Sequence, residues 1–76
     1  MQEWINSPMS NEVIKFGKKL KGVRQKKNLS QGDVARILGV HRTYISGLER
    51  GARNPSLLTV NKIAKALGVN PKALVG

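Results

Sequence analysis

Apolar residues recur every three or four positions through most of this chain, which is the pattern of amphipathic helices. The first stripe follows a polar start at Ser10 or Asn11 and extends to about Lys27, where Asn28 ends the helix. Lysines fill the opposite side, and no segment alternates with the period of two that indicates a strand. The stripe consists of Val13, Phe16, Gly17, Leu20 and Val23.

Two short helices are predicted next. Ser30, with Asp33 three positions later, makes a capping box that begins a helix extending to about Leu38. A third helix extends from Arg42 to about Arg50, and a glycine follows it as a stop signal. The residues expected to face inward are Val34, Ala35, Leu38, Ile45 and Leu48.

The pattern of residues in the last third of the chain predicts two more helices. One follows a turn at residues 54–56 and ends at Gly68. A short fifth helix over residues 71–75 begins with Asn70 as its N-cap and a proline in its first position. Residues 1–10 show no helical period, so we expect an arm followed by one all-α domain of five helices over residues 11–76. The stripe of the fourth helix is Leu57, Val60, Ile63, Ala64 and Leu67.

The second and third predicted helices have the features of a helix-turn-helix. The motif needs a small residue where its helices cross, and Ala35 supplies one. It also needs a turn residue that accepts a positive φ, and Gly39 follows four positions later. Together and in register, these features predict a DNA-binding motif. Apolar anchors with the spacing to point back between the helices are Val40, Ile45 and Leu48.

The net charge of the chain indicates which class of molecule it binds. Lysine and arginine number 14 against four acidic residues, which gives a net charge of +10. Such an excess indicates a polyanionic partner, most often nucleic acid. Only three aromatic residues are present, whereas proteins that bind single strands stack bases on rows of aromatic side chains. Double-stranded DNA is therefore the expected partner.

Composition also excludes several classes of function. The absence of cysteine and the single histidine, His41, leave no thiolate or multi-histidine metal site. The four acidic residues are too scattered for a carboxylate cage, and no nucleophile–base pair is present. We therefore expect no metal, no cofactor, no small-molecule ligand and no enzymatic activity. No apolar run reaches the ~18 residues of a membrane span, and the start lacks a signal-peptide core, so a cytoplasmic protein is expected.

Residues 29–69, LSQGDVARILGVHRTYISGLERGARNPSLLTVNKIAKALGV, closely follow the pattern of a known family. The chain resembles the phage-repressor and Cro type of helix-turn-helix domain, also called the Xre-like family, over residues 13–74. This resemblance implies a lambda-repressor-like DNA-binding fold. Within the family, residues 41–54 (HRTYISGLERGARN) are most similar to the controller proteins of restriction–modification systems. Those are small dimers that activate or repress their own operon.

The start of the third helix carries the candidates for base readout. In a helix-turn-helix, the N-terminal residues of the second motif helix reach base edges in the major groove. Arg42 can donate two hydrogen bonds to guanine there. Gly47 stands where other family members carry a long polar side chain, so base readout should depend mainly on the first turn. The predicted base contacts are Arg42, Thr43, Tyr44 and Ser46.

The resemblance also assigns phosphate contacts and a structural ion pair. A glutamine at the first turn of the second helix, Gln31, bonds a phosphate and braces the recognition helix in the family. Arg24 and Glu49 are implied to pair and to tie the first helix to the third, so Arg24 is not a DNA contact. A solvated polar surface is the alternative reading of the phosphate candidates, which are Gln31, Arg50, Arg53 and Asn54.

A single recognition helix reads too few base pairs to find one site in a genome. We therefore expect a two-fold homodimer on a near-palindromic operator. An exposed apolar patch of Leu58, Leu74 and Val75 is the predicted interface. In the alternative arrangement, Leu74 closes the core of the monomer.

The sequence thus predicts a sequence-specific regulator of transcription, either a restriction–modification controller protein or a phage-type repressor. An antitoxin-like module whose main partner is a toxin protein is the alternative. Little of the chain lies outside the helix-turn-helix domain to bind a toxin. The operator sequence, the regulated genes and the choice between activation and repression are left open.

Overall fold

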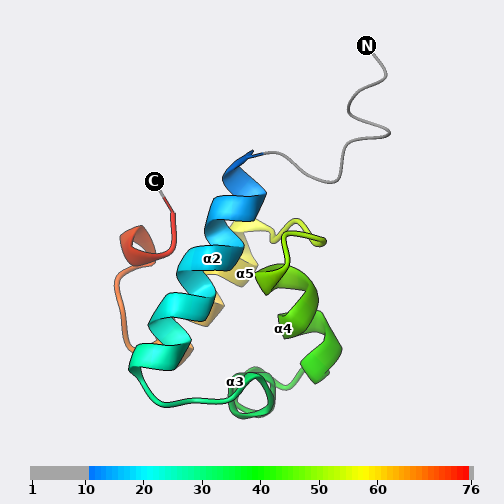
Figure 1. The fold of residues 1–76 in the computed structure, drawn as a ribbon. Helices are drawn as coiled ribbons and strands as arrows, with labels where there is room; N and C mark the ends of the chain where they lie inside the picture. The colour runs from blue at the N-terminus through cyan, green and yellow to red at the C-terminus, as the bar shows by residue number, and fades with distance from the viewer. Residues whose placement is uncertain (1–10, 76) are drawn as a thin grey trace.

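A computed structural model describes residues 11–75, and within that range it contains four α-helices, one turn of 3₁₀ helix and no strand. The elements are α2 (Asn11–Lys26), α3 (Gln31–Leu38), α4 (Arg42–Glu49), α5 (Leu57–Leu67) and η1 (Pro71–Ala73). Figure 1 shows α2 with α4 on one side and the C-terminal segment on the other. The all-α architecture is confirmed, whereas the arm expected over residues 1–10 lies outside the described residues.

Local capping sets the helix boundaries. Ser30 begins α3 with a capping box, in which its Oγ accepts a hydrogen bond from the Asp33 amide at 2.9 Å. The Asp33 carboxylate in turn accepts from the Ser30 amide at 2.8 Å. Ser56 caps α5 by accepting from the Thr59 amide at 3.1 Å. Gly39 ends α3 with a φ of 73°, a conformation that favours glycine.

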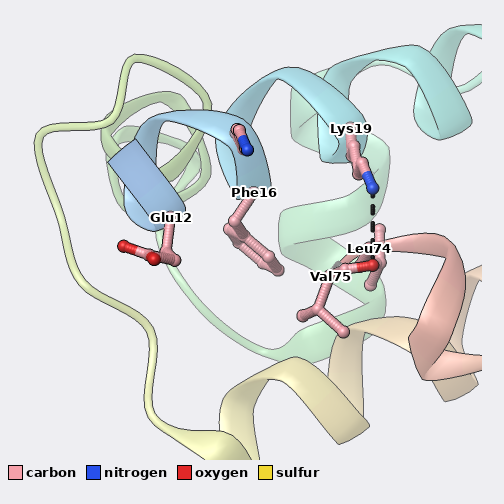
Figure 2. Close-up of a pocket in the computed structure, with 6 residues that line it drawn as sticks. Glu12, Phe16, Lys19, Leu74 and Val75 are labelled. Carbon is pink, nitrogen blue, oxygen red and sulfur yellow. Dashed lines mark hydrogen bonds between the residues drawn. The ribbon is translucent and has the colours of Figure 1, made fainter. Parts of the chain in front are cut away.

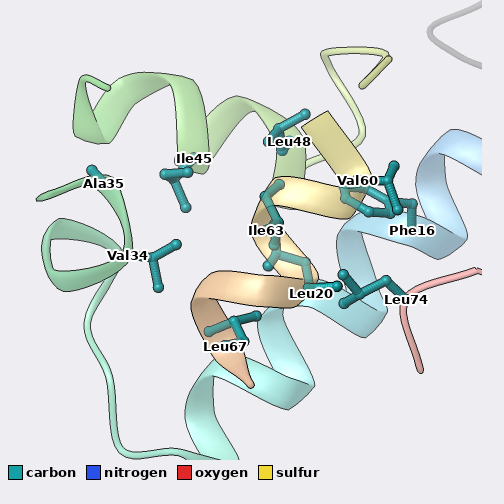
Figure 3. Close-up of a cluster of buried hydrophobic side chains, with 11 residues drawn as sticks. Phe16, Leu20, Val34, Ala35, Ile45, Leu48, Val60, Ile63, Leu67 and Leu74 are labelled. Carbon is teal, nitrogen blue, oxygen red and sulfur yellow. The ribbon is translucent and has the colours of Figure 1, made fainter. Parts of the chain in front are cut away.

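The core forms where all four helices meet. Figure 3 shows side chains from α2, α3, α4 and α5 converging, with Leu74 from the C-terminal segment beside Leu20. Each large apolar side chain buried in this way contributes roughly 1.5–3 kcal/mol relative to an exposed one. The residues with no exposed surface are Leu20, Val34, Ile45, Leu48, Ile63 and Leu74.

The backbone of α4 lies close against α2 at Gly17. A Cβ atom on Gly17 would overlap the carbonyl oxygen of Leu48 and would lie 2.7 Å from that of Glu49. Contacts this short are backbone contacts that no side-chain rotation can relieve. The absence of a side chain at Gly17 therefore allows α2 and α4 to pack closely. This close packing also determines how near the polar side chains of the two helices lie to each other.

The predicted fifth α-helix is wrong, because Pro71–Ala73 forms one 3₁₀ turn. Asn70 caps the turn by accepting from the Lys72 amide, and the Leu74 amide bonds the Pro71 carbonyl three residues back. The chain then directs Leu74 into the core with no exposed surface. Its predicted place in an exposed dimer patch is therefore wrong, because burial in the monomer core removes this side chain from the surface.

Two residues predicted to face inward are exposed. Leu57 is the first residue of α5 and is 78% exposed, so the buried stripe of that helix begins at Val60. Val40 is 38% exposed. The turn after α3 closes through a backbone hydrogen bond from the Val40 amide to the Ala35 carbonyl, and the Val40 side chain is not needed as an anchor.

Candidate nucleic-acid interface

α3 and α4 form the two helices of a helix-turn-helix joined at Gly39. Val34 and Ala35 of α3 pack into the same core as Ile45 of α4. Ala35 is 3% exposed, which agrees with the need for a small residue near the crossing of the two helices. This packing leaves the outer side of the first turn of α4 open to solvent.

Arg24 and Glu49 form a buried, two-pronged ion pair between α2 and the end of α4. Nε of Arg24 donates to Oε2 of Glu49 at 2.6 Å, and Nη2 donates to Oε1 at 3.0 Å. Nη1 donates to the Leu29 carbonyl at 2.8 Å, which ties the segment before α3 to the same guanidinium. Every nitrogen of the guanidinium therefore has a partner within the protein, so this arginine is structural.

Both members of the pair are charged at neutral pH. Burial alone would raise the pKa of Glu49, but the hydrogen bonds from Arg24 and Gln31 outweigh it and hold that pKa below its ordinary value. The hydrogen bond to Glu49 raises the pKa of Arg24 despite the opposing effect of desolvation. Both directions favour the ionised form of the pair.

Gln31 connects this ion pair to the surface of α4. Its Nε2 donates to Oε1 of Glu49 at 3.0 Å, and its Oε1 accepts from Nη1 of Arg42 at 3.0 Å. The sequence predicts a phosphate contact for Gln31, whereas both ends of its amide are engaged within the protein here. A continuous chain of hydrogen bonds therefore extends from Arg24 to Arg42.

The predicted base contacts differ in exposure. Arg42 and Thr43 are exposed in the first turn of α4, and Ser46 is half-buried in the second. Tyr44 is half-buried and packs against the core. α4 begins after His41, whose side chain forms no capping hydrogen bond. Arg42 and Thr43 are thus the most accessible of the four predicted side chains.

The side chain of Arg53 lies across α4, where Gly47 leaves room for it. A Cβ atom on Gly47 would lie 3.0 Å from Cγ of Arg53. The guanidinium carbon of Arg53 is 5.5 Å from the centroid of the Tyr44 ring, within the range of a cation–π contact. A residue of the following loop therefore covers the position on α4 that has no side chain of its own.

The remaining phosphate candidates lie farther along the chain. Arg50 is exposed and occupies the C-cap position of α4. Asn54 is exposed and, with Pro55, lines a hollow beside Glu12 at the start of α2. The structure thus brings Gln31 and Arg53 next to the predicted base contacts and places Asn54 nearer to α2.

Comparison with known proteins agrees with this geometry. The sequence pattern described as helix-turn-helix matches residues 20–74, which include α3, α4 and α5. The chain belongs to the helix-turn-helix family. The matched range also contains both members of the buried ion pair. The resemblance to the Xre-like type of helix-turn-helix and, within it, to controller proteins is confirmed.

The relatives of this helix-turn-helix protein include several controllers. It is 49% identical over 69 residues to the control protein C.BamHI of Bacillus amyloliquefaciens, covering 88% of this chain and 85% of that protein. The crystal structure of the restriction–modification controller protein C.AhdI from Aeromonas hydrophila is 44% identical with a TM-score of 0.78, covering 82% and 94% of the two chains. A crystal structure of the controller protein C.Esp1396I, a tetramer in complex with its natural 35-base-pair operator, is 36% identical with a TM-score of 0.75 and 80% coverage of each chain.

Two determinants of this helix-turn-helix domain are not evident in the sequence. Gly17 reads as one more member of the apolar stripe, although a glycine inside a long helix costs up to about 1 kcal/mol relative to alanine and so signals a packing role. The contact between Gly47 and Arg53 joins a helix to a loop, and helical periodicity cannot predict it. The only signal in the sequence is the glycine itself, inside a predicted helix where glycine is unfavourable.

The charged residues on the rest of the described surface are mostly basic. Exposed lysines lie along α2, on the side that the core does not use. Among residues 11–75, no group of three His, Asp or Glu side chains could hold a metal ion. In the same range, no helix is long and apolar enough to cross a membrane. The exposed lysines of α2 are Lys15, Lys18, Lys21 and Lys26.

Proposed function

We propose that this protein regulates transcription by binding a specific sequence of double-stranded DNA through α4. The strongest support is the chain of hydrogen bonds that reaches from the buried Glu49 through Gln31 to the exposed Arg42. A side chain restrained in this way loses less conformational freedom when it binds. Its guanidinium can then donate to O6 and N7 of guanine in the major groove.

The other contacts divide between bases and phosphates. Thr43 offers a hydroxyl for a base edge and a methyl group for thymine. Positively charged and amide side chains around α4 bind the DNA backbone and fix the register of the helix in the groove. We assign base contacts to Arg42, Thr43, Tyr44 and Ser46. We assign phosphate contacts to Arg50, Arg53 and Asn54, and to Gln31, whose Nε2 has a second hydrogen to donate besides the one bonded to Glu49.

The working form in this proposal is a dimer on a near-palindromic operator. Two symmetric copies place their recognition helices in successive major grooves, about 34–36 Å apart. We place the dimer surface at Leu58, which is 63% exposed beside the still more exposed Leu57. Val75, which the sequence assigns to the same surface, lines a groove beside α2 instead.

Control of a restriction–modification operon is the setting we favour. C.BamHI is named as a control protein, and C.AhdI as a restriction–modification controller protein. Neither name refers to a toxin partner, so the antitoxin-like alternative gains no support from them. In this proposal the regulator acts in the cytoplasm, and its action includes no catalytic step.

Selection of bound sequences from a pool of random double-stranded DNA tests the proposal. We expect one enriched site with two-fold symmetry and half-sites separated by about one helical turn, ~10–10.5 base pairs. The Arg42→Ala variant, selected in parallel, should lose enrichment at one guanine position of each half-site. Binding that enriches no sequence would contradict the proposal.

Two measurements test the mode of binding. A dimer that neutralises about 6–10 phosphates should show a log–log dependence of affinity on salt with a slope of roughly −5 to −9. Sedimentation should give a dimer for the wild type and a monomer for Leu58→Asp, which places a charge in the proposed interface. A slope near zero, or an unchanged dimer in the variant, would remove the corresponding part of the proposal.

A further inference from the structure

A groove lies beside α2, where this helix meets the C-terminal segment. Its volume is about 390 Å³. Figure 2 shows Phe16 between Glu12 on one side and the C-terminal residues on the other. Val75 is 45% exposed, so the groove offers apolar surface to solvent. The groove is lined by Glu12, Lys15, Phe16, Lys19, Leu74 and Val75.

A stripe of lysines continues from the groove along α2. Residues 15, 19, 22 and 26 recur at steps of three and four, which places them on one side of the helix. Lys15 and Lys26 are exposed and form no ion pair within residues 11–75. Lys19 donates to the Val75 carbonyl at 3.4 Å. From Lys15 to Lys26 the stripe is about 16–17 Å long at 1.5 Å per residue, or about three helical turns.

Gly22 lies within this stripe and leaves the backbone of α2 open to solvent. A Cβ atom at Gly22 would meet nothing within 4 Å, so no packing inside the described domain requires a glycine there. Glycine in the interior of a helix is unfavourable relative to alanine. Because Gly22 has no side chain, another backbone can approach α2 more closely at this point than at its neighbours.

The stripe faces away from α4. Gly17 and Arg24 are residues of α2 that contact α4. At 100° per residue, they lie roughly 160–180° around the helix from Lys15. Figure 1 likewise shows α4 on one side of α2 and the C-terminal segment on the other. A molecule bound along the stripe would therefore leave the first turn of α4 accessible.

We propose that α2 binds an acidic amphipathic helix of a partner protein along this stripe. One large apolar side chain of the partner fills the groove against Phe16 and Val75, and carboxylates of the partner pair with Lys15 and Lys26. A helix bound in a groove presents its anchors at steps of three and four, which is the spacing of the stripe. The backbone of the partner passes α2 at Gly22. This contact is separate from the DNA contacts proposed for α4.

The groove favours this partner over a second DNA duplex. The phosphates of a duplex can pair with lysines, but a sugar–phosphate backbone has no apolar side chain to place against Phe16 and Val75. A second copy of this domain is disfavoured by charge. It would bring the lysines of both α2 helices together, in a chain whose net charge is +10.

Fluorescence anisotropy with a synthetic peptide tests the proposal. The probe is a labelled helix of alanine, glutamate and leucine, with leucines at steps of three and four and glutamates beside them. The reference peptide has the same composition in scrambled order, so it carries the same charge without the helical spacing. We expect the full chain to bind the probe about tenfold more tightly than the reference. Operator duplex bound to α4 should leave the affinity for the probe unchanged.

Matched variants locate the contact. Val75→Asp places a charge in the groove and should weaken probe binding roughly tenfold, since an apolar contact is lost. Ile37→Asp makes the same kind of change at an exposed residue of α3 that does not line the groove, and it should bind like the wild type. Lys26→Glu should weaken binding by about fivefold, the upper range for a surface ion pair. Lys65→Glu, at an exposed lysine of α5, is its control.

Gly22→Leu separates partner binding from folding. Leucine favours the helix, and the space around Gly22 is open, so the melting temperature should rise. The same side chain blocks the approach of the partner, so probe binding should fall. Higher stability with unchanged probe binding would contradict the role given to Gly22. This exposed position keeps the test valid even if Val75→Asp unfolds the protein.

Three further outcomes would overturn the proposal. Equal binding of the probe and the scrambled reference would show that net charge alone attracts them. Displacement of the probe by random duplex, from protein whose α4 already holds operator, would assign the stripe to DNA. A monomeric Val75→Asp variant in sedimentation would assign the groove to a second copy. Because the free chain is measured as well, the result does not depend on whether α4 binds DNA.

Discussion

The side-chain oxygen of Gln31 accepts a hydrogen bond from Nη1 of Arg42 at 3.0 Å. The first residue of α3 thus restrains the side chain of the first residue of α4. The amide nitrogen of the same glutamine donates to the buried Glu49. The position of an exposed arginine thus depends on an ion pair in the interior. In the proposed mode of binding, this connection gives Gln31 a part in DNA recognition without a base contact of its own.

Gln31→Ala should weaken binding to the selected operator by about 0.5–1.5 kcal/mol, the usual net contribution of one hydrogen bond. Random DNA should be affected less, because the variant releases Arg42, the arginine that we propose reads the base. Titration of both DNAs measures the difference. Gln25→Ala, which removes an exposed glutamine of α2, is the control and should bind like the wild type. An equal loss on both DNAs would make Gln31 a phosphate contact alone.

Arg42→Ala should lose roughly 1–3 kcal/mol on the operator and little on random DNA, because a guanidinium that donates twice to guanine discriminates between bases. Arg42→Lys should recover only part of the loss, since an ammonium group cannot form the paired contact. The same titrations measure both variants. Full recovery with lysine would indicate that the side chain acts only through its charge.

Removing one member of the buried ion pair should destabilise the fold strongly. Arg24→Met or Glu49→Leu leaves a charge buried without its partner, which typically costs about 3–5 kcal/mol. The double variant should lose less than either single variant, because no unpaired charge remains. Urea unfolding gives the three free energies. Losses that simply add in the double variant would show that the two residues do not interact.

The same pair predicts how stability depends on pH. The pKa of Glu49 is lower in the folded protein than in the unfolded chain, where it is about 4.3. Its contribution is therefore complete above that value and is lost as the pH falls through the folded-state pKa. The Ser30 backbone amide lowers the pKa of Asp33 in the same direction. Glu49→Gln should show a shallower loss of stability on acidification, and an unchanged pH profile would contradict this account.

Substitution of alanine at two glycines should change the stability of the fold in opposite directions. Gly17→Ala should destabilise the protein, because its methyl group would meet the backbone carbonyls of Leu48 and Glu49. Gly32→Ala should stabilise it by up to about 1 kcal/mol through helix propensity, because its methyl group would find only ordinary contacts, the nearest being Ser30 Oγ at 3.6 Å. Thermal unfolding compares the pair directly. A tolerated alanine at position 17 would show that the helices can move apart freely.

The sequence predicts local features of this fold well, because they depend on neighbours along the chain. Ser30, Gly39 and Gly68 mark helix ends through capping and left-handed geometry, which need only a few residues. Whether Leu57 and Leu74 are buried or exposed depends instead on the residues that pack around them in the folded chain. Leu57 comes one turn too early to meet the core, and Leu74 meets it only because the chain turns after η1.

In the candidate site too, the sequence predicts some features and not others. The residues of the first turn of α4 follow from the motif, and the ion pair of Arg24 with Glu49 follows from the resemblance to a family. The double engagement of Gln31 and the placement of Arg53 over Tyr44 depend on side-chain geometry between separate elements. No periodic pattern encodes such contacts, so only the structure gives them.

Gly47 has a consequence for how chains of this kind diversify. Its empty position on α4 is covered by Arg53, a residue of the loop that follows the helix. Loops accept substitutions and insertions more readily than packed helices do. Part of the proposed DNA-binding surface can therefore change without disturbing the ion pair or the core. Under selection, a new operator preference could arise in this loop while the fold stays constant.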